Sequence, residues 1–183
     1  MAELARRPAL CNEAGALRYD GADFTLRAVM DKFITRLQWR PAGGAGNSRL
    51  EQLTQLKLPD EPLQRAGTDP AVFWCAPGEW LIVGANVTDG SLRKVLGGLP
   101  DSVNCVVTDS GCGLACIRMA GDGALPRLAR GCSAPLEHTA GGHYLLTRLF
   151  GMPALVHKVD DSPAFDLYID RTTSRYLWDC LLA

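Results

Sequence analysis

The sequence has little of what marks nucleic-acid-binding, membrane and secreted proteins. Its 19 Lys and Arg residues against 20 Asp and Glu give a net charge of -1, so no basic excess is present to neutralise phosphates. No apolar run reaches the roughly 18 residues that span a bilayer. Residues Met1–Arg7 contain no apolar core of a signal peptide, and we therefore expect a cytoplasmic protein that binds neither nucleic acid nor membrane.

Disulfides and metal clusters are not favoured either. The chain has 7 cysteines, an odd number, and most lie inside apolar runs, which is typical of reduced thiols in a cytosolic protein. With 183 residues, 47% of them hydrophobic, the chain is long enough for one globular domain or a compact duplicated one.

The most apolar stretch predicts a β-hairpin. Strands over Phe73–Ala76 and Trp80–Val83 are joined by Pro77-Gly78-Glu79, where Pro presets one corner of a turn and Gly tolerates positive φ at the next. Such a hairpin needs covering by other parts of the chain. We interpret the four tryptophans as core residues: Trp39, Trp74, Trp80 and Trp178.

Residues 1–22 show no periodicity and are predicted to form an extended N-terminal arm. Residues 23–183 predict a single α+β domain, a duplicated βαββα (ferredoxin-like) arrangement of two structural repeats, about 33–99 and 103–183. The first repeat reads as strand 33–39, helix 48–57, hairpin 73–83 and helix 91–98. The second reads as strand 114–119, helix 123–130, hairpin 144–159, strand 164–169 and helix 172–182.

Local patterns refine several of these elements. Ser48 and Glu51 have the spacing of a capping box, and Gly151-Met152-Pro153 predicts a hairpin turn. Strand 164–169 places Phe165, Leu167 and Ile169 on one face, with Asp166 and Tyr168 on the other. The final helix is expected to pack through Tyr176, Leu177, Cys180 and Leu181.

One set of residues superficially resembles a zinc site: Cys112, Cys116, His138 and His143. If 112–116 begins a strand, the two cysteine backbones lie roughly 13 Å apart, at about 3.3 Å per residue. Two ligands of one tetrahedral zinc lie far closer. Core cysteines and surface-loop histidines are therefore the favoured interpretation.

Structural roles are also the favoured interpretation for three further sets of residues that could have belonged to a functional site. Gly43–Gly46 follows a strand and precedes a helix, but it matches no phosphate-binding motif and predicts a flexible connection. Asp160 and Asp161 lie next to Ser162-Pro163 and predict a solvated turn rather than an acid–base pair. His157 lies within a strand and is expected to be a core or interface histidine. No catalytic, cofactor-binding or metal-binding residue is predicted in this chain.

An ordered series of blocks carries a family resemblance from about residue 70 to the C-terminus. The blocks are 76–83 (APGEWLIV), 107–110 (VTDS), 128–133 (LARGCS), 147–149 (TRL) and 165–178, which runs from FDLY to RYLW. This series resembles the gamma subunit of heterotetrameric sarcosine oxidase. The resemblance implies a fold similar to the folate-binding domain of aminomethyltransferases.

The same resemblance implies a role in a flavoenzyme complex. That complex oxidatively demethylates sarcosine and passes the one-carbon unit to tetrahydrofolate. In the family, FAD and FMN are placed with the beta subunit, NAD and folate with alpha, and zinc with delta. The gamma subunit carries none of these cofactors and serves assembly with the alpha, beta and delta subunits.

Alternatives remain open. Segments 42–47 and 59–70 look individual, so a related N-methyl amino acid is also a candidate substrate, as in N-methylglutamate dehydrogenase and related oxidases. A stand-alone folate-binding protein or aminomethyltransferase-like enzyme would need a carboxylate for the pterin, and Asp109 is the obvious candidate. The Lys-Gly-Cys motif of folate-dependent iron–sulfur assembly proteins is absent; its nearest match is Arg130-Gly131-Cys132-Ser133, which lacks the rest of the motif. An unrelated α+β interaction module is the third alternative.

Overall fold

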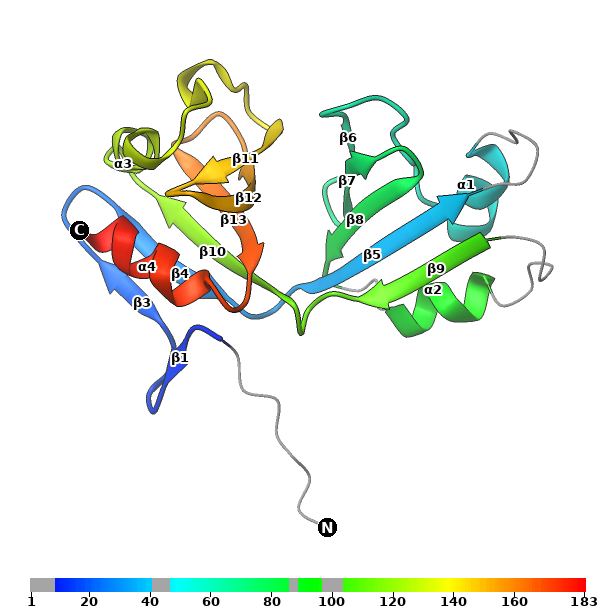
Figure 1. Cartoon of the computed structure of the whole chain (residues 1–183), viewed down its shortest axis with the longest axis horizontal. Coiled ribbons are helices and arrows are strands. Elements are labelled where there is room, and N and C mark those ends of the chain that lie inside the picture. Colours follow the sequence, from blue (N-terminus) through cyan, green and yellow to red (C-terminus); the bar gives the residue numbers. More distant parts are fainter. Residues whose placement is uncertain (1–8, 41–46, 86–88, 97–103) are drawn as a thin grey trace, which may run out of the picture. The chain divides into compact units, whose positions relative to one another are not determined.

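The computed structural model describes residues 9–40, 47–85, 89–96 and 104–183, and within these no helix is long and apolar enough to cross a membrane. The chain forms two compact units (Figure 1): residues 1–30 with 113–183, called unit 1, and residues 31–112, called unit 2. Every strand pairing in the described residues is antiparallel. The expected α+β class is therefore confirmed.

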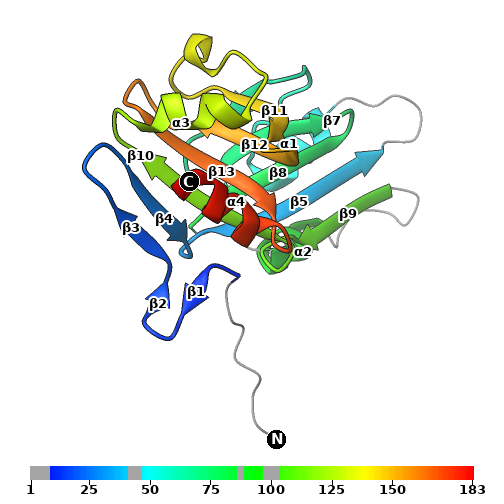
Figure 2. The ribbon, with the colours of Figure 1, turned by 60° about the vertical axis from the view of Figure 1, so that its left-hand side comes forward.

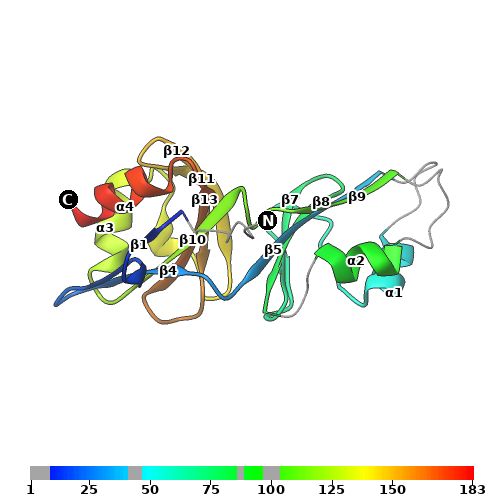
Figure 3. The ribbon, with the colours of Figure 1, turned by 90° about the horizontal axis from the view of Figure 1, so that it is seen from below.

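Unit 2 has the strand order of a split βαβ fold. Its elements are, in chain order, β5 (Phe33–Arg40), α1 (Ser48–Thr54), β6 (Arg65–Ala66), β7 (Ala71–Ala76), β8 (Glu79–Gly84), α2 (Asp89–Leu96) and β9 (Asn104–Asp109). The sheet order is β6-β7-β8-β5-β9. Apart from the short β6, this is the βαββαβ arrangement of ferredoxin-like domains. Both helices lie on one face of the sheet (Figure 3).

Unit 1 repeats this order with one strand taken from the N-terminal part of the chain. Its elements are β1 (Cys11–Asn12), β2 (Gly15–Ala16), β3 (Arg18–Asp20), β4 (Thr25–Val29), β10 (Leu114–Ala120), α3 (Ala124–Gly131), the 3-10 helix η2 (Leu136–His138), β11 (Tyr144–Leu149), β12 (Met152–Lys158), β13 (Ala164–Asp170) and α4 (Ser174–Leu182). The main sheet has the order β11-β12-β13-β10-β4-β3. Strand β4 lies beside β10 as β9 lies beside β5 in unit 2.

Helices α3 and α4 lie on one face of the unit 1 sheet (Figure 2). The core between the sheet and these helices is formed by apolar side chains that alternate along the strands, because neighbouring residues of a strand point to opposite faces. Its most buried members include Leu26, Ile117, Met119, Leu128, Phe165, Leu167, Leu177 and Leu181. The unit 2 core is a second cluster, which includes Leu37, Trp39, Leu50, Trp80, Ile82 and Leu92.

The division of the chain differs from the expected repeats. Residues 11–20, expected within an extended arm, contain β1–β3, and Leu10 is only 2% exposed within the unit 1 core. Strand β9, expected to open the second repeat, pairs with β5 in unit 2. Residues 1–8 of the expected arm lie outside the described residues. The boundaries of the two units are set by which distant strands pair with each other. The local periodicity of the sequence carries no information on that pairing.

The central hairpin forms as predicted, from β7 and β8. Gly78 in its turn has φ of 71°, and a Cβ there would collide with the Trp39 carbonyl oxygen. The Trp39 N–H donates to the Gly78 carbonyl at 2.7 Å, which ties the turn to β5. Trp80 is 1% exposed, and its Nε1–H donates to the Pro59 carbonyl at 2.6 Å. The hairpin is thus anchored on both its turn and its central side chain.

Three of the four tryptophans are buried as expected, namely Trp39, Trp80 and Trp178. Trp74 is half-buried and packs at the margin of the unit 2 core. The predicted packing face of the last helix was partly wrong. Leu177, Trp178 and Leu181 are buried, whereas Tyr176 is 53% exposed, because the helix is rotated to bring Trp178 inward.

Two local predictions, the capping box at the start of α1 and the residues of the β11–β12 turn, were also wrong. Ser48 makes no capping bond to α1, because the N-cap is Asn47 and the Glu51 carboxylate instead accepts the Leu58 N–H at 2.7 Å. The β11–β12 turn consists of Phe150 and Gly151, both with positive φ, and Met152-Pro153 begins β12. A two-residue turn with positive φ matches the twist of the paired strands.

Replacing Trp80 tests the hairpin anchor. Trp80→Ala is expected to lower the free energy of unfolding by about 3–5 kcal/mol, because it opens a large cavity in the core. Trp80→Phe keeps most apolar area but leaves the Pro59 carbonyl without its donor, so we expect a smaller loss of about 1–3 kcal/mol. Urea denaturation measures both. Equal losses for the two variants would contradict the role of the indole hydrogen bond.

Candidate functional site

A row of polar side chains crosses the unit 1 sheet. The register pairs Tyr144 with His157, His157 with Asp166, Asp166 with Arg118, and Arg118 with Arg27. Residues directly opposite each other on antiparallel strands project from the same face. The apolar residues between them belong to the core on the other face, so this row lies on the face opposite α3 and α4.

The centre of the row is a bidentate ion pair. Arg118 Nε donates to Asp166 Oδ1 at 2.7 Å, and Arg118 Nη2 donates to Oδ2 at 2.8 Å. The Asp166 side chain is 1% exposed and the Arg118 side chain 35% exposed. The hydrogen bond to Asp166 raises the pKa of Arg118 above its ordinary value. Both carboxylate oxygens are engaged, so Asp166 acts as a fixed anchor for the guanidinium rather than as a free base.

Neighbouring groups on this face are buried as well. Tyr168 is 3% exposed, and burial, followed by the charges of Cys116 and Asp166, raises the pKa of its hydroxyl. Cys116 is 3% exposed, and His157 is 6% exposed, as its position within a strand predicted. At neutral pH the phenol of Tyr168 therefore stays protonated, and this part of the sheet presents no exposed nucleophile.

A second polar group lies in unit 2, beside the central hairpin. Glu79 accepts from Arg36 Nη1 at 2.9 Å and from Gln38 Nε2 at 2.9 Å. Cys75 occupies the register shift between Trp74 and Ala76, a β-bulge in β7. Burial and then the charge of Glu79 raise the pKa of the Cys75 thiol to about 11. The thiolate is the nucleophilic form, and a raised pKa keeps most of this thiol protonated near neutral pH.

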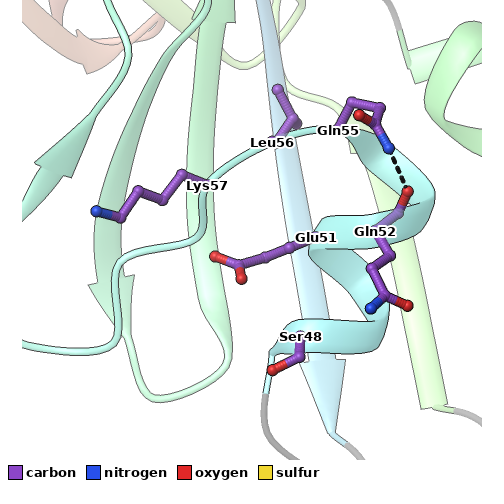
Figure 4. Close-up of a pocket in the computed structure, with 6 residues that line it drawn as sticks. All are labelled: Ser48, Glu51, Gln52, Gln55, Leu56 and Lys57. Carbon is purple, nitrogen blue, oxygen red and sulfur yellow. Dashed lines mark hydrogen bonds between the residues drawn. The ribbon is translucent and has the colours of Figure 1, made fainter.

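An open groove of about 520 Å³ lies along α1 and the segment that follows it (Figure 4). Its lining residues are Ser48, Glu51, Gln52, Gln55, Leu56 and Lys57. The Glu51 carboxylate is occupied by the Leu58 N–H, and Gln55 Nε2 donates to the Gln52 carbonyl at 2.6 Å. Among the described residues, the lining contains no histidine, cysteine or aromatic side chain. The two hydrogen bonds hold the end of α1 in place, and the described lining carries no assembled catalytic group.

The structure does not bring the residues of the zinc-like spacing together. Cys116 is buried in β10 and Cys112 is exposed, while His138 ends η2 and His143 lies exposed before β11. Within the described part of the chain, no group of three His, Cys, Asp or Glu residues is arranged to hold a metal ion. Gly43–Gly46 lies outside the described residues.

The remaining acidic candidates serve turns. The Asp160 carboxylate accepts from the Ser162 N–H at 2.8 Å and from the Ser162 hydroxyl, and these bonds lower the pKa of Asp160. Asp109 ends β9 and accepts the Gly111 N–H at 2.9 Å. The Gly131 carbonyl at the end of α3 accepts the Phe150 N–H at 2.7 Å, so the 130–133 segment secures the β11–β12 turn.

The sequence analysis did not identify the Arg118–Asp166 pair. It placed Asp166 on the face opposite Phe165 and Leu167, which is confirmed, but it could not show that this face is also buried there. The available signal was one acidic residue in the middle of an apolar strand, because unpaired carboxylates are almost never fully buried. The partner is 48 residues away along the chain, and only the register identifies it.

Removing the arginine tests whether the pair neutralises a buried charge. Arg118→Met is expected to lower the free energy of unfolding at pH 7 by about 3–5 kcal/mol, because it leaves a buried carboxylate uncompensated. Protonation removes that charge. The deficit relative to wild type should therefore shrink as pH falls from 7 towards about 4, the ordinary range of aspartate.

The control is Asp166→Asn, which removes the buried charge and leaves Arg118 partly exposed to solvent. The difference in free energy of unfolding between this variant and wild type should stay nearly constant over the same pH range. Urea denaturation at several pH values measures both variants, and a pH-independent deficit for Arg118→Met would contradict the assignment.

Thiol labelling tests the environment of Cys75. At pH 8, a thiol with a pKa of about 11 is thiolate in roughly one molecule in a thousand. We expect iodoacetamide to modify the exposed Cys112 early and Cys75 only after denaturation, as peptide mass spectrometry would show. Early labelling of Cys75 in the folded protein would contradict its partly buried position beside Glu79.

Comparisons with known proteins identify the fold. No family model matches the sequence, and no curated protein sequence matches it significantly. A chain of the heterotetrameric sarcosine oxidase from Corynebacterium sp. U-96, solved in complex with pyrrole 2-carboxylate, is 22% identical with a TM-score of 0.74. The match covers 90% of this chain and 87% of that one.

The glycine cleavage system aminomethyltransferase T from Bartonella henselae is also similar, with 11% identity and a TM-score of 0.61. The match covers 88% of this chain but 46% of the aminomethyltransferase, so this chain spans about half of that protein's length. The two likenesses confirm the expected fold similarity.

Proposed function

We propose that this chain is a gamma-type, non-catalytic subunit of a heterotetrameric complex resembling sarcosine oxidase. The observation that carries the proposal is the match over nearly the full length of both chains, 90% and 87%, with a TM-score of 0.74. The aminomethyltransferase match leaves more than half of that protein without a counterpart. The ordered sequence blocks from Ala76 to Trp178 point to the same family independently.

The proposed complex oxidatively demethylates sarcosine, or a related N-methyl amino acid, and passes the one-carbon unit to tetrahydrofolate. FAD, FMN, NAD and zinc reside on the alpha, beta and delta subunits, and this chain holds these partners together in the cytoplasm. It supplies scaffold surface rather than reacting groups.

The pairing of its polar side chains supports this role. Both oxygens of Asp166 are engaged by Arg118, and both oxygens of Glu79 are engaged by Arg36 and Gln38. A general base needs a carboxylate within hydrogen-bond reach of the substrate proton that it abstracts. Carboxylates held by neighbouring arginine and glutamine side chains instead stabilise one packing arrangement.

A second candidate is a stand-alone folate-binding protein or aminomethyltransferase-like enzyme. The likeness to aminomethyltransferase T, with a TM-score of 0.61 over 88% of this chain, favours it. Asp109, its expected pterin carboxylate, accepts the Gly111 N–H in a turn. This bond engages one carboxylate oxygen and leaves the candidate weaker than the subunit role.

Affinity purification tests the proposed function. An affinity-tagged chain, produced in its native cells, is expected to co-purify larger subunits that show flavin absorbance and oxidise an N-methyl amino acid. The isolated chain is expected to give no heat of binding when titrated with tetrahydrofolate. A chain recovered without flavoprotein subunits would contradict the proposal, and micromolar tetrahydrofolate binding by the isolated chain would favour the second candidate.

A further inference from the structure

Three arginines stand side by side on neighbouring strands of unit 1. The register places Arg18 of β3 opposite Arg27 of β4, and Arg27 opposite Arg118 of β10. They therefore project from the same face of the sheet, opposite α3 and α4. Directly opposite residues have Cβ atoms about 4.5–5.5 Å apart, and like charges at that spacing destabilise the pairing.

The two outer arginines have acidic partners. Arg18 Nε donates to Asp20 Oδ2 at 2.6 Å, and Arg118 holds both oxygens of Asp166. The middle arginine differs, because the Arg27 side chain is exposed and makes no hydrogen bond or ion pair with the described residues. The row thus holds three arginines against two aspartates, and its uncompensated charge lies at the centre.

This arrangement suits a single carboxylate. The side chains of Arg18 and Arg118 are 63% and 35% exposed, so an incoming group can reach the row from solvent. The planar guanidinium of Arg27 offers two parallel N–H donors that match a carboxylate. Nucleic acid is a poor fit, because it needs several uncompensated basic groups and this chain has a net charge of -1.

We propose that the face of β3, β4 and β10 around Arg27 docks an acidic segment of a partner protein. A carboxylate of that segment binds Arg27 between its two arginine neighbours and relieves the repulsion within the row. The inference rests on the proposed function in one respect: the partner is taken to be another subunit of the complex.

Charge reversal at the centre of the row tests the proposal. In the tagged chain, Arg27→Glu is expected to weaken assembly with the flavoprotein subunits by at least about tenfold, the loss of one charge-assisted contact. Arg130→Glu is the matched control, because it makes the same charge change at an exposed arginine of α3, on the helix side of unit 1. The control should assemble like wild type, and the wild-type interaction should weaken with added salt.

Stability separates docking from a structural role. An acid between Arg18 and Arg118 removes like-charge repulsion, so Arg27→Glu should keep or raise the melting temperature while losing binding. Assembly at wild-type strength by Arg27→Glu would overturn the proposal, as would equal weakening in both variants. A lowered melting temperature in Arg27→Glu would also overturn it, since it would assign Arg27 to the fold itself.

A direct probe keeps this test separate from that of the proposed function. Hexaglutamate is titrated into the isolated chain, and binding is followed by NMR shifts of the Arg27 region. Wild-type binding that is lost in Arg27→Glu and retained in Arg130→Glu supports the acidic-segment site even if no flavoprotein subunit co-purifies. Absence of hexaglutamate binding to the wild type, or equal binding by all three proteins, overturns the site and leaves the proposed subunit role to its own experiment.

Discussion

The pairing of β4 with β10 is the constraint on which the organisation of unit 1 depends. It brings residues 25–29 beside residues 116–120, which lie some 90 positions later in the chain. The strand that completes the sheet thus comes before every helix of unit 1 in the sequence. The same pairing recruits β3 and the β1–β2 hairpin. Without it, β10 would be an unpaired edge, and the N-terminal segment would have no sheet to join.

The pairing also determines the chemistry of the sheet's two faces. One face buries alternating apolar residues under α3 and α4, and the other carries the row of polar groups that includes Arg27, Arg118 and Asp166. A register shift by one residue would exchange these faces and bury the arginines in the core. The register is therefore strongly specified, and the ion pair of Arg118 with Asp166 is one of its consequences.

In unit 2 the hairpin of β7 and β8 is fixed to the rest of the sheet and to the segment after α1. Trp80 joins it to the segment after α1 through the Pro59 carbonyl, and Gly78 joins its turn to β5. Beside the hairpin, Glu79 accepts hydrogen bonds from Arg36 and Gln38 of β5. Each unit thus combines an apolar face covered by helices with polar side chains that are paired to one another.

Local sequence determined the positions of most strands and helices, the turn at Pro77-Gly78 and the burial of Trp80, because periodicity and turn chemistry act over a few residues. It also indicated the solvated turn at Asp160. Only the tertiary structure decided that β9 joins β5, that residues 25–29 complete the other sheet, and that Asp166 meets Arg118. Those outcomes depend on pairings between distant segments, whose free energy comes from burying shared faces and neutralising charges. No window of neighbouring residues contains that information.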